Sequence, residues 1–257
     1  MNLQALIFDV DGTLADTERD GHRPAFNAAF AEAGLDWQWD VALYGELLSV
    51  TGGKERIRHY LDNYRPEITL PENADTWIAG LHQAKTRHYL RLLNEGLIPL
   101  RPGVKRLIDE ARQAGLRLAI ATTTTPENVS TLLEATMGKD SIGWFEVIAA
   151  GDIVAKKKPD PAIFIYALEA LNLPAHACLA FEDSRNGLRS STGAGLRTLV
   201  TVNDYTRDDD FSGASMILES LGEPDAPAVC LSTPGVQCVV NLELLTELTQ
   251  NSSEHSI

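Results

Sequence analysis

Two aspartates, Asp9 and Asp11, follow directly after a short apolar run, Ala5–Phe8. Such a run ending in a glycine-containing turn is typical of a buried strand. The carboxylates therefore stand at the mouth of an apolar layer, where an uncompensated charge is costly or picks up a proton. Side chains two residues apart in an extended segment face the same side, and Gly12 allows a sharp turn. The pattern predicts a metal ion, a cationic side chain or several N–H donors beside the two carboxylates.

Polar residues also occur at three later places in the chain, and we expect all three to lie at the same edge of the sheet as Asp9 and Asp11. Thr122 to Thr125 follow an apolar run at 116–121, Lys156 to Lys158 follow Gly151-Asp152, and Glu182 with Asp183 follows the apolar run at 177–181. The carboxyl ends of parallel strands share one edge of a sheet, which is where open α/β sheets bind ligands. Hydroxyl, cationic and acidic groups converging there predict a site for phosphoryl transfer.

Each of these groups also has a plainer interpretation. An Asp-x-Asp-Gly segment is common in turns and calcium loops, but this copy lacks the spaced acidic ligands and closing glutamate of a helix-loop-helix calcium site. Thr124 and Thr125 can simply cap a helix, and the later acidic pair can simply charge a helix N-terminus. Within the lysine run we expect Lys156 and Lys157 to be structural or solvated, and Lys158, directly before Pro159, to be functional.

Alternating helices and strands must bring these groups together. After the first strand, strands are predicted over 116–121, 145–149, 177–181, 197–202 and 215–218, with a hairpin pairing 229–231 and 237–240. Helices are predicted over 17–34, 41–48, 54–61, 73–93, 104–114, 126–136, 161–171, 186–194 and 242–248, before a frayed tail at 250–257. This is an α/β fold, a Rossmann-like parallel sheet core with helices on both faces and an inserted all-helical cap domain. The core would comprise residues 1–16 and 97–257, and the cap residues 17–96.

Composition narrows the functional classes. The chain has 257 residues, 44% of them hydrophobic, and a formal charge of −14, which argues against a nucleic-acid or anionic-membrane surface. No stretch approaches a membrane span, and the first strand begins almost at once, so we expect no signal peptide and a cytoplasmic protein, expected to be a monomer. Cys178, Cys230 and Cys238 lack metal-site spacing and are expected to be free thiols.

The order of acid pair, threonine, Lys-Pro and Glu-Asp resembles the four motifs of the haloacid dehalogenase superfamily of aspartate-nucleophile phosphotransferases. The resemblance covers residues 3 to about 206 and implies that Asp9 is the nucleophile and Asp11 the general acid and base. It further implies Mg²⁺ held by the carboxylates of Asp9 and Asp183 and the backbone carbonyl of Asp11. Thr122 and Lys158 would hold the phosphoryl oxygens, and Glu182 would support the site from its rim.

Within this superfamily the strings DGTLADTE, GGKER and KKKPDPAIF are most similar to the CbbY group. That resemblance implies a sugar-bisphosphate phosphatase that removes the 1-phosphate of xylulose 1,5-bisphosphate, with a cap that closes over the site and selects the substrate. The predicted substrate contacts are Glu18, Gly53, Lys54, Arg56, Lys85 and Thr123. Tyr44, His22 and His88 are expected to pack or to face solvent. A β-phosphoglucomutase-like phosphomutase, a phosphoglycolate phosphatase and, more remotely, a non-catalytic binding protein on the same fold remain alternatives.

Overall fold

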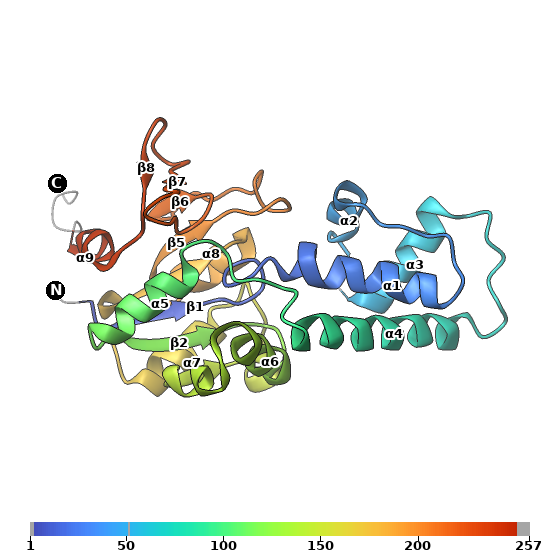
Figure 1. The fold of residues 1–257 in the computed structure, drawn as a ribbon, viewed down its shortest axis with the longest axis horizontal. Helices are drawn as coiled ribbons and strands as arrows, with labels where there is room; N and C mark the ends of the chain where they lie inside the picture. The colour runs from blue at the N-terminus through green and yellow to red at the C-terminus, as the bar shows by residue number, and fades with distance from the viewer. Residues whose placement is uncertain (1–2, 51, 251–257) are drawn as a thin grey trace. The chain divides into compact units, whose positions relative to one another are not determined.

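The computed structural model describes residues 3–50 and 52–250 (Figure 1). The chain divides into two compact units, one made of Met1–Asp16 with Pro99–Ile257 and the other of Thr17–Ile98. The sequence prediction ended the inserted part at residue 96, whereas the second unit ends at Ile98. We call these the core unit and the helical unit and describe each by itself.

A six-stranded parallel sheet forms the centre of the core unit, in the order β3-β2-β1-β4-β5-β6. The strands are β1 (Ala5–Phe8), β2 (Arg117–Ala121), β3 (Val147–Ala149), β4 (Cys178–Glu182), β5 (Arg197–Thr201) and β6 (Met216–Leu218). Every predicted strand is present, within two residues of its expected bounds. All four residues of β1 are fully buried, because β1 lies between β2 and β4 and both faces of the sheet are covered.

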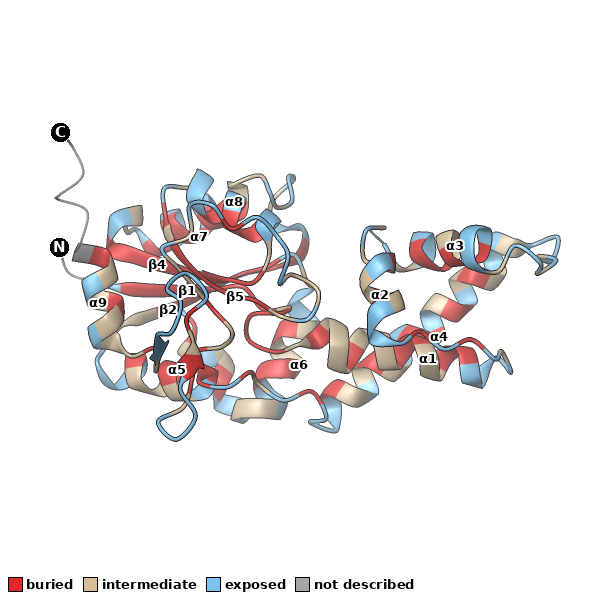
Figure 2. Ribbon diagram, turned by 90° about the horizontal axis from the view of Figure 1, so that it is seen from above, coloured by how far each residue is buried: buried red, intermediate tan, exposed pale blue. Residues whose placement is uncertain are grey.

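Helices cover both faces of this sheet, as predicted (Figure 2). The predicted helices of the core unit are α5 (Val104–Gln113), α6 (Pro126–Met137), α7 (Ala162–Leu171), α8 (Arg185–Gly193) and α9 (Leu242–Gln250). Alanines of β1, β2 and β4 pack with Ile163, Phe164 and Ala167 of α7, and these small residues let that helix approach the sheet closely. Three short 3-10 turns, Lys139–Trp144, Gly151–Ile153 and Ala175–Ala177, lie outside the predictions because they are too short to show a period.

The C-terminal segment adds to the edge of the core unit. The predicted hairpin is present but short, with β7 (Ala228–Val229) antiparallel to β8 (Gln237–Cys238). Cys230 continues the ladder next to Leu218, so the segment covers the outer edge of β6. All three cysteines are free thiols, as expected. The predicted frayed tail at 250–257 lies outside the described residues, apart from Gln250 at the end of α9.

The helical unit contains the predicted helices, except that the helix predicted over 17–34 is divided in two. It comprises a π-helical segment (Thr17–His22), α1 (Arg23–Glu32), α2 (Val41–Leu47), α3 (Gly53–Tyr64) and α4 (Ala74–Asn94). The single helix predicted over 17–34 is divided around Gly21, where a Cβ atom would lie 2.6 Å from Ile98 and 2.8 Å from Tyr89, so only glycine permits this close approach. No helix within the described part of the chain is both long and apolar enough to cross a bilayer.

Candidate active site

Asp9 extends β1 by one residue at the carboxyl edge of the sheet. Phe8 pairs with Ile120 of β2 and Phe181 of β4, and the Asp9 N–H donates to the Phe181 carbonyl at 3.0 Å. The Asp9 side chain is buried, with 6% of the residue exposed. The sheet therefore holds this carboxylate in a fixed position away from bulk water.

Lys158 is the cation that compensates Asp9. Its Nζ donates to Asp9 Oδ1 at 2.7 Å and to Glu182 Oε1 at 2.5 Å, and only 8% of its side chain is exposed. Burial lowers the pKa of Lys158, but the charges and hydrogen bonds of Asp9 and Glu182 outweigh burial and raise that pKa above its ordinary value. Lys158 is therefore protonated at neutral pH.

The other two lysines of the run have structural partners, as predicted. The Lys156 side chain is 76% exposed and pairs with Asp160 at 3.4 Å. Lys157 donates to the Gly151 carbonyl and pairs with Asp152 at 2.7 Å. Of the three, Lys158 is the one that reaches the aspartate after β1.

The prediction that Glu182 lies on the rim is wrong. The residue is 1% exposed, because β4 continues to Glu182 and pairs it with Val200 of β5. Its Oε2 accepts the Asp183 N–H at 3.4 Å and lies where a Cβ atom on Gly187 would meet it at 1.9 Å. Glu182 is thus enclosed between Lys158 and the first turn of α8.

Asp9, Glu182 and Asp183 together form a site that fits a divalent cation. One carboxylate oxygen from each lies within 4.8 Å of the other two, and all three residues are buried. Burial is the largest cause that raises the pKa of Glu182 and of Asp183, and the neighbouring carboxylates add to it. With all three carboxylates ionised, Lys158 would offset only one of the three negative charges. A hard divalent cation, which prefers carboxylate oxygens, would balance the remaining two.

The loop after Asp9 turns back on itself next to this cluster. Asp11 is half-buried, and Gly12 has a φ of +82°, which only glycine adopts readily. The N–H of Leu14 donates to the Val10 carbonyl at 2.9 Å, and the N–H of Gly12 donates to the Ala15 carbonyl at 2.8 Å. These bonds fix the backbone on either side of Asp11.

Thr122 lies at the same edge after β2. Only 1% of it is exposed, and its N–H donates to the Ala149 carbonyl at 2.9 Å. Thr125 caps α6 by accepting the Asn128 N–H at 3.3 Å, so the plainer interpretation holds for that residue. Thr124 accepts a bond from the Asn128 side chain at 3.3 Å, and Thr123 is exposed.

Two residues that contact the site were missed by the sequence prediction, buried Arg101 and partly buried Asn203. Arg101 is 7% exposed and donates to the carbonyls of Gly12, Thr201, Val202 and Glu219. Asn203 donates from Nδ2 to Asp183 Oδ2 at 2.7 Å. Asn203 directly follows the strand predicted over 197–202, just as Thr122 directly follows the strand predicted over 116–121. A search for polar residues after predicted strands would therefore have found Asn203 as it found Thr122. Arg101 has no comparable signal, because its partners lie in distant segments of the chain and most of them are backbone carbonyls, besides the carboxylate of Asp16 at 3.3 Å and the hydroxyl of Thr201 at 3.1 Å.

The predicted substrate contacts of the helical unit form two groups. Glu18 Oε2 accepts the Tyr44 hydroxyl at 2.6 Å, and Arg56 donates to that hydroxyl oxygen at 2.8 Å. Arg56 also donates to the Leu47 and Val50 carbonyls and is buried. Tyr44 is fully buried and packs on Phe26 and Trp39, consistent with its expected packing role.

The second group surrounds Lys85, which is 8% exposed. Its Nζ lies 2.8 Å from Nδ1 of His22, whose ring stacks on Tyr89 with centroids 3.9 Å apart. Burial and the charge of Lys85 lower the pKa of His22 well below its ordinary value, so the ring is neutral and accepts from the ammonium.

The remaining residues of the helical unit are more exposed. Gly53 begins α3, and Lys54 is exposed beside a groove of about 540 Å³ shared with Arg58, His59 and Asp75. His88 pairs with Glu32 at 2.6 Å, as expected for a residue without a site role.

Known proteins resemble this chain in sequence and in structure. A sequence model of the haloacid dehalogenase-like hydrolases matches residues 3–195. Protein CbbY from a plasmid of Cupriavidus necator is 52% identical over 88% of this chain and 88% of its own length. Protein CbbY of Rhodobacter capsulatus is 52% identical over 89% of this chain and 98% of its own length. A crystal structure of a CbbY mutant from Rhodobacter sphaeroides in complex with xylulose-1,5-bisphosphate is 49% identical, covers 85% of this chain and 94% of that chain, and superposes with a TM-score of 0.71.

Proposed function

The chain belongs to the haloacid dehalogenase-like hydrolase family, and we propose that it is a Mg²⁺-dependent phosphatase that converts xylulose 1,5-bisphosphate to xylulose 5-phosphate and inorganic phosphate. The observation that carries the chemistry is the buried cluster in which Lys158 bonds Asp9 beside Glu182 and Asp183. The substrate is proposed from the 52% identity to CbbY proteins and from the sugar bisphosphate bound to the Rhodobacter sphaeroides protein.

In the proposed mechanism a carboxylate oxygen of Asp9 attacks phosphorus. An O–P bond to Asp9 forms while the bond to the sugar oxygen breaks, giving an aspartyl-phosphate. Asp11 gives its proton to the departing sugar oxygen and then takes one from the water that attacks the aspartyl-phosphate. Phosphate and the free carboxylate of Asp9 result. The half-buried position of Asp11, outside the buried cluster, suits a group that must both hold and release a proton.

The remaining groups of the core unit hold charge in place. Lys158 would stabilise the negative charge on the phosphoryl oxygens, and Thr122 would donate a neutral hydrogen bond to them. Asp9, Asp183 and the backbone carbonyl of Asp11 would hold Mg²⁺, which when bound supplies two positive charges to the transferring phosphoryl group. Glu182, fixed against Lys158, keeps that ammonium directed at Asp9.

We also propose that substrate selection uses the residues that the sequence singled out. Thr123 is exposed at the carboxyl edge of β2, and the helical unit supplies Glu18, Gly53, Lys54, Arg56 and Lys85. Arg56 and Lys85 are buried cations with fixed positions, which is the arrangement expected for recognition of a second phosphate.

The test is phosphate release with and without Mg²⁺ from xylulose 1,5-bisphosphate, ribulose 1,5-bisphosphate, β-glucose 1-phosphate and phosphoglycolate. We expect a preference for the xylulose bisphosphate, loss of turnover in EDTA, and no turnover by the Asp9→Asn variant, which keeps the fold. Conversion of β-glucose 1-phosphate to glucose 6-phosphate without phosphate release would instead make the protein a mutase. Substantial turnover by Asp9→Asn would eliminate Asp9 as the nucleophile.

A further inference from the structure

Asn203 lies two residues after the end of β5 and contacts the metal cluster through Asp183. Its Nδ2 donates to Asp183 Oδ2 at 2.7 Å, and no step of the proposed mechanism uses it. We propose that Asn203 is a positioning residue that fixes the Asp183 carboxylate for metal binding. The inference rests on the proposed Mg²⁺ site and adds to it a residue that does not itself contact the metal.

The orientation of the Asn203 amide is determined by its surroundings. Its Oδ1 accepts the N–H of Tyr205 at 2.9 Å, and its own N–H donates to Thr206 Oγ1 at 3.1 Å. Because the amide oxygen is held by a donor, the NH₂ group must point the opposite way, toward Asp183. The carboxylate can only accept, so the two groups match without any change in charge. The loop after β5 thus presents one fixed donor to Asp183.

The hydrogen bond is also enclosed on the side of the Asp11–Gly12 loop. A Cβ atom on Gly12 would lie 2.1 Å from Asp183 Oδ2 and 2.7 Å from Asn203 Nδ2. The Gly12 backbone therefore packs against both atoms of the bond and shields this side of it from water. A hydrogen bond to a charged group is stronger when water is excluded.

This arrangement restricts how the Asp183 carboxylate can turn. With Oδ2 bonded to Asn203 beneath Gly12, rotation about the bond to the carboxylate would break a charge-assisted hydrogen bond. The bond therefore limits the directions in which Asp183 can present a carboxylate oxygen to the space that it shares with Asp9 and Glu182. Outer partners that orient ligating carboxylates typically contribute about 10- to 100-fold to metal affinity.

The experiment measures Mn²⁺ binding by electron paramagnetic resonance, in which the signal of the free ion disappears on binding. Two substitutions separate positioning from loop structure. Asn203→Ala removes both side-chain bonds. In Asn203→Ser the serine hydroxyl can still accept the Tyr205 N–H and so keep the turn, but it is too short to reach Asp183. We expect both variants to raise the Kd for Mn²⁺ by about 10- to 100-fold.

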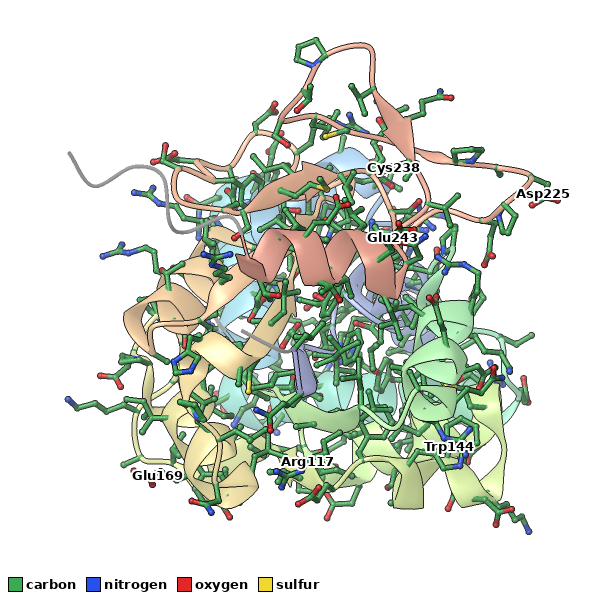
Figure 3. The ribbon with its side chains drawn as sticks, turned by 90° about the vertical axis from the view of Figure 1, so that its left-hand side faces the viewer. Arg117, Trp144, Glu169, Asp225, Cys238 and Glu243 are labelled. Atoms are coloured by element: carbon green, nitrogen blue, oxygen red, sulfur yellow. The ribbon has the colours of Figure 1, made fainter. Side chains whose placement is uncertain are left out.

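Asn241→Ala is the matched control. Asn241 Oδ1 accepts the Leu244 N–H at 2.9 Å at the start of α9, so this variant also loses a turn-forming amide. Figure 3 views the core unit from the end that carries α9, with Glu243 of α9 and Arg117 at the start of β2 labelled. Leu242, the residue after Asn241, lines a pocket with Arg117 and with Gln4 just before β1, so the control lies at the amino end of the strands. Its Kd should equal that of the unsubstituted protein.

The results distinguish this inference from the proposed function. Asn203→Ser should unfold in EDTA at nearly the temperature of the unsubstituted protein while binding Mn²⁺ more weakly, which a merely structural role would not produce. Equal Mn²⁺ affinity of Asn203→Ser and the unsubstituted protein would overturn the inference alone. An unsubstituted protein that binds no Mn²⁺ would overturn the metal site and the inference together. Weaker Mn²⁺ binding by Asn203→Ser in a protein that releases no phosphate would support the inference and overturn the phosphatase activity.

Discussion

Replacing Lys158 by methionine should strongly destabilise the metal-free core unit. The ammonium has 8% of its side chain exposed and bonds two carboxylates, Asp9 at 2.7 Å and Glu182 at 2.5 Å. A hydrogen bond to a charged group contributes about 1.5–3 kcal/mol, so the two together contribute about 3–6 kcal/mol. Breaking a buried ion pair by removing one partner typically costs about 3–5 kcal/mol, since the remaining charge is left uncompensated. We therefore expect Lys158→Met to lower the free energy of unfolding by about 3–5 kcal/mol.

The measurement must report on the core unit alone, because the chain has two units. Hydrogen exchange of peptides that contain β1 and β4, followed by mass spectrometry in EDTA at neutral pH, gives the free energy of opening at those strands. Adding saturating Mg²⁺ should recover part of the loss, since a divalent cation then offsets the uncompensated charge of the buried carboxylates. Combining the variant with Glu182→Gln should also recover stability, because one of the uncompensated charges is removed.

Lys156→Met is the control from the same run of lysines. Its side chain is 76% exposed and pairs with Asp160 at 3.4 Å, so its loss should change the free energy of unfolding by no more than about 0.5 kcal/mol. A loss for Lys158→Met below about 1 kcal/mol, the range of exposed pairs, would refute the assignment of Lys158 as the compensating cation of a buried cluster. Further destabilisation on adding Glu182→Gln would refute the electrostatic origin of the effect.

Three further variants test other parts of the structure. Gly12→Ala forces a residue with a side chain into a φ of +82° and places its Cβ atom against Asp183. The variant should lose about 1–2 kcal/mol of unfolding free energy and about 100-fold in turnover. Near-normal turnover would contradict the close approach of the Gly12 backbone to Asp183. Arg101→Lys keeps the charge but loses the planar fork, so urea denaturation should show a loss of at least about 3 kcal/mol, and a smaller loss would show that the backbone bonds are dispensable. The pKa of His22 in the folded protein lies below its ordinary value of 6.5, so the unfolded chain binds more protons below that pH and the helical unit should lose stability as the pH falls through it. His22→Gln should reduce this dependence of stability on pH, which can be measured from unfolding followed by tryptophan fluorescence. An unchanged slope of stability against pH would exclude His22 as the source of the dependence.

The sequence was sufficient for the strands and for the groups at their carboxyl ends. The apolar run of β1 is unambiguous because it is buried on both faces, and the proline after Lys158 distinguished that lysine from its two neighbours. The position of Glu182 was misjudged because hydrophobicity ends at Phe181, whereas the backbone ladder continues for one more pair. An acidic residue can be buried inside a strand only when a cation compensates its charge. The cation here is Lys158, which lies 24 residues away in the sequence, so the local pattern does not indicate it.

Contacts to backbone groups could not be predicted from the sequence. Arg101 looks like an ordinary basic residue before a proline, and nothing in its neighbourhood indicates four carbonyl partners from three separate segments. The π-helical segment at Thr17–His22 depends on how closely Gly21 approaches Tyr89 and Ile98, which is a property of packing rather than of local preference.

The bonds of Arg101 also have a consequence for synthesis on the ribosome. Its partners Gly12, Thr201 and Glu219 are separated from it by 89, 100 and 118 residues along the chain. The helical unit is one continuous stretch, Thr17–Ile98, and is complete before either strand that flanks β1 has been translated. The nascent chain therefore carries an unpaired, apolar β1 until β2 (Arg117–Ala121) has been made, and it lacks the second partner of β1 until β4 ends at Glu182. Such late, non-local pairing favours slow folding and transient aggregation. The residues that would bind the metal come together only near the end of synthesis, after the part of the chain proposed to choose the substrate.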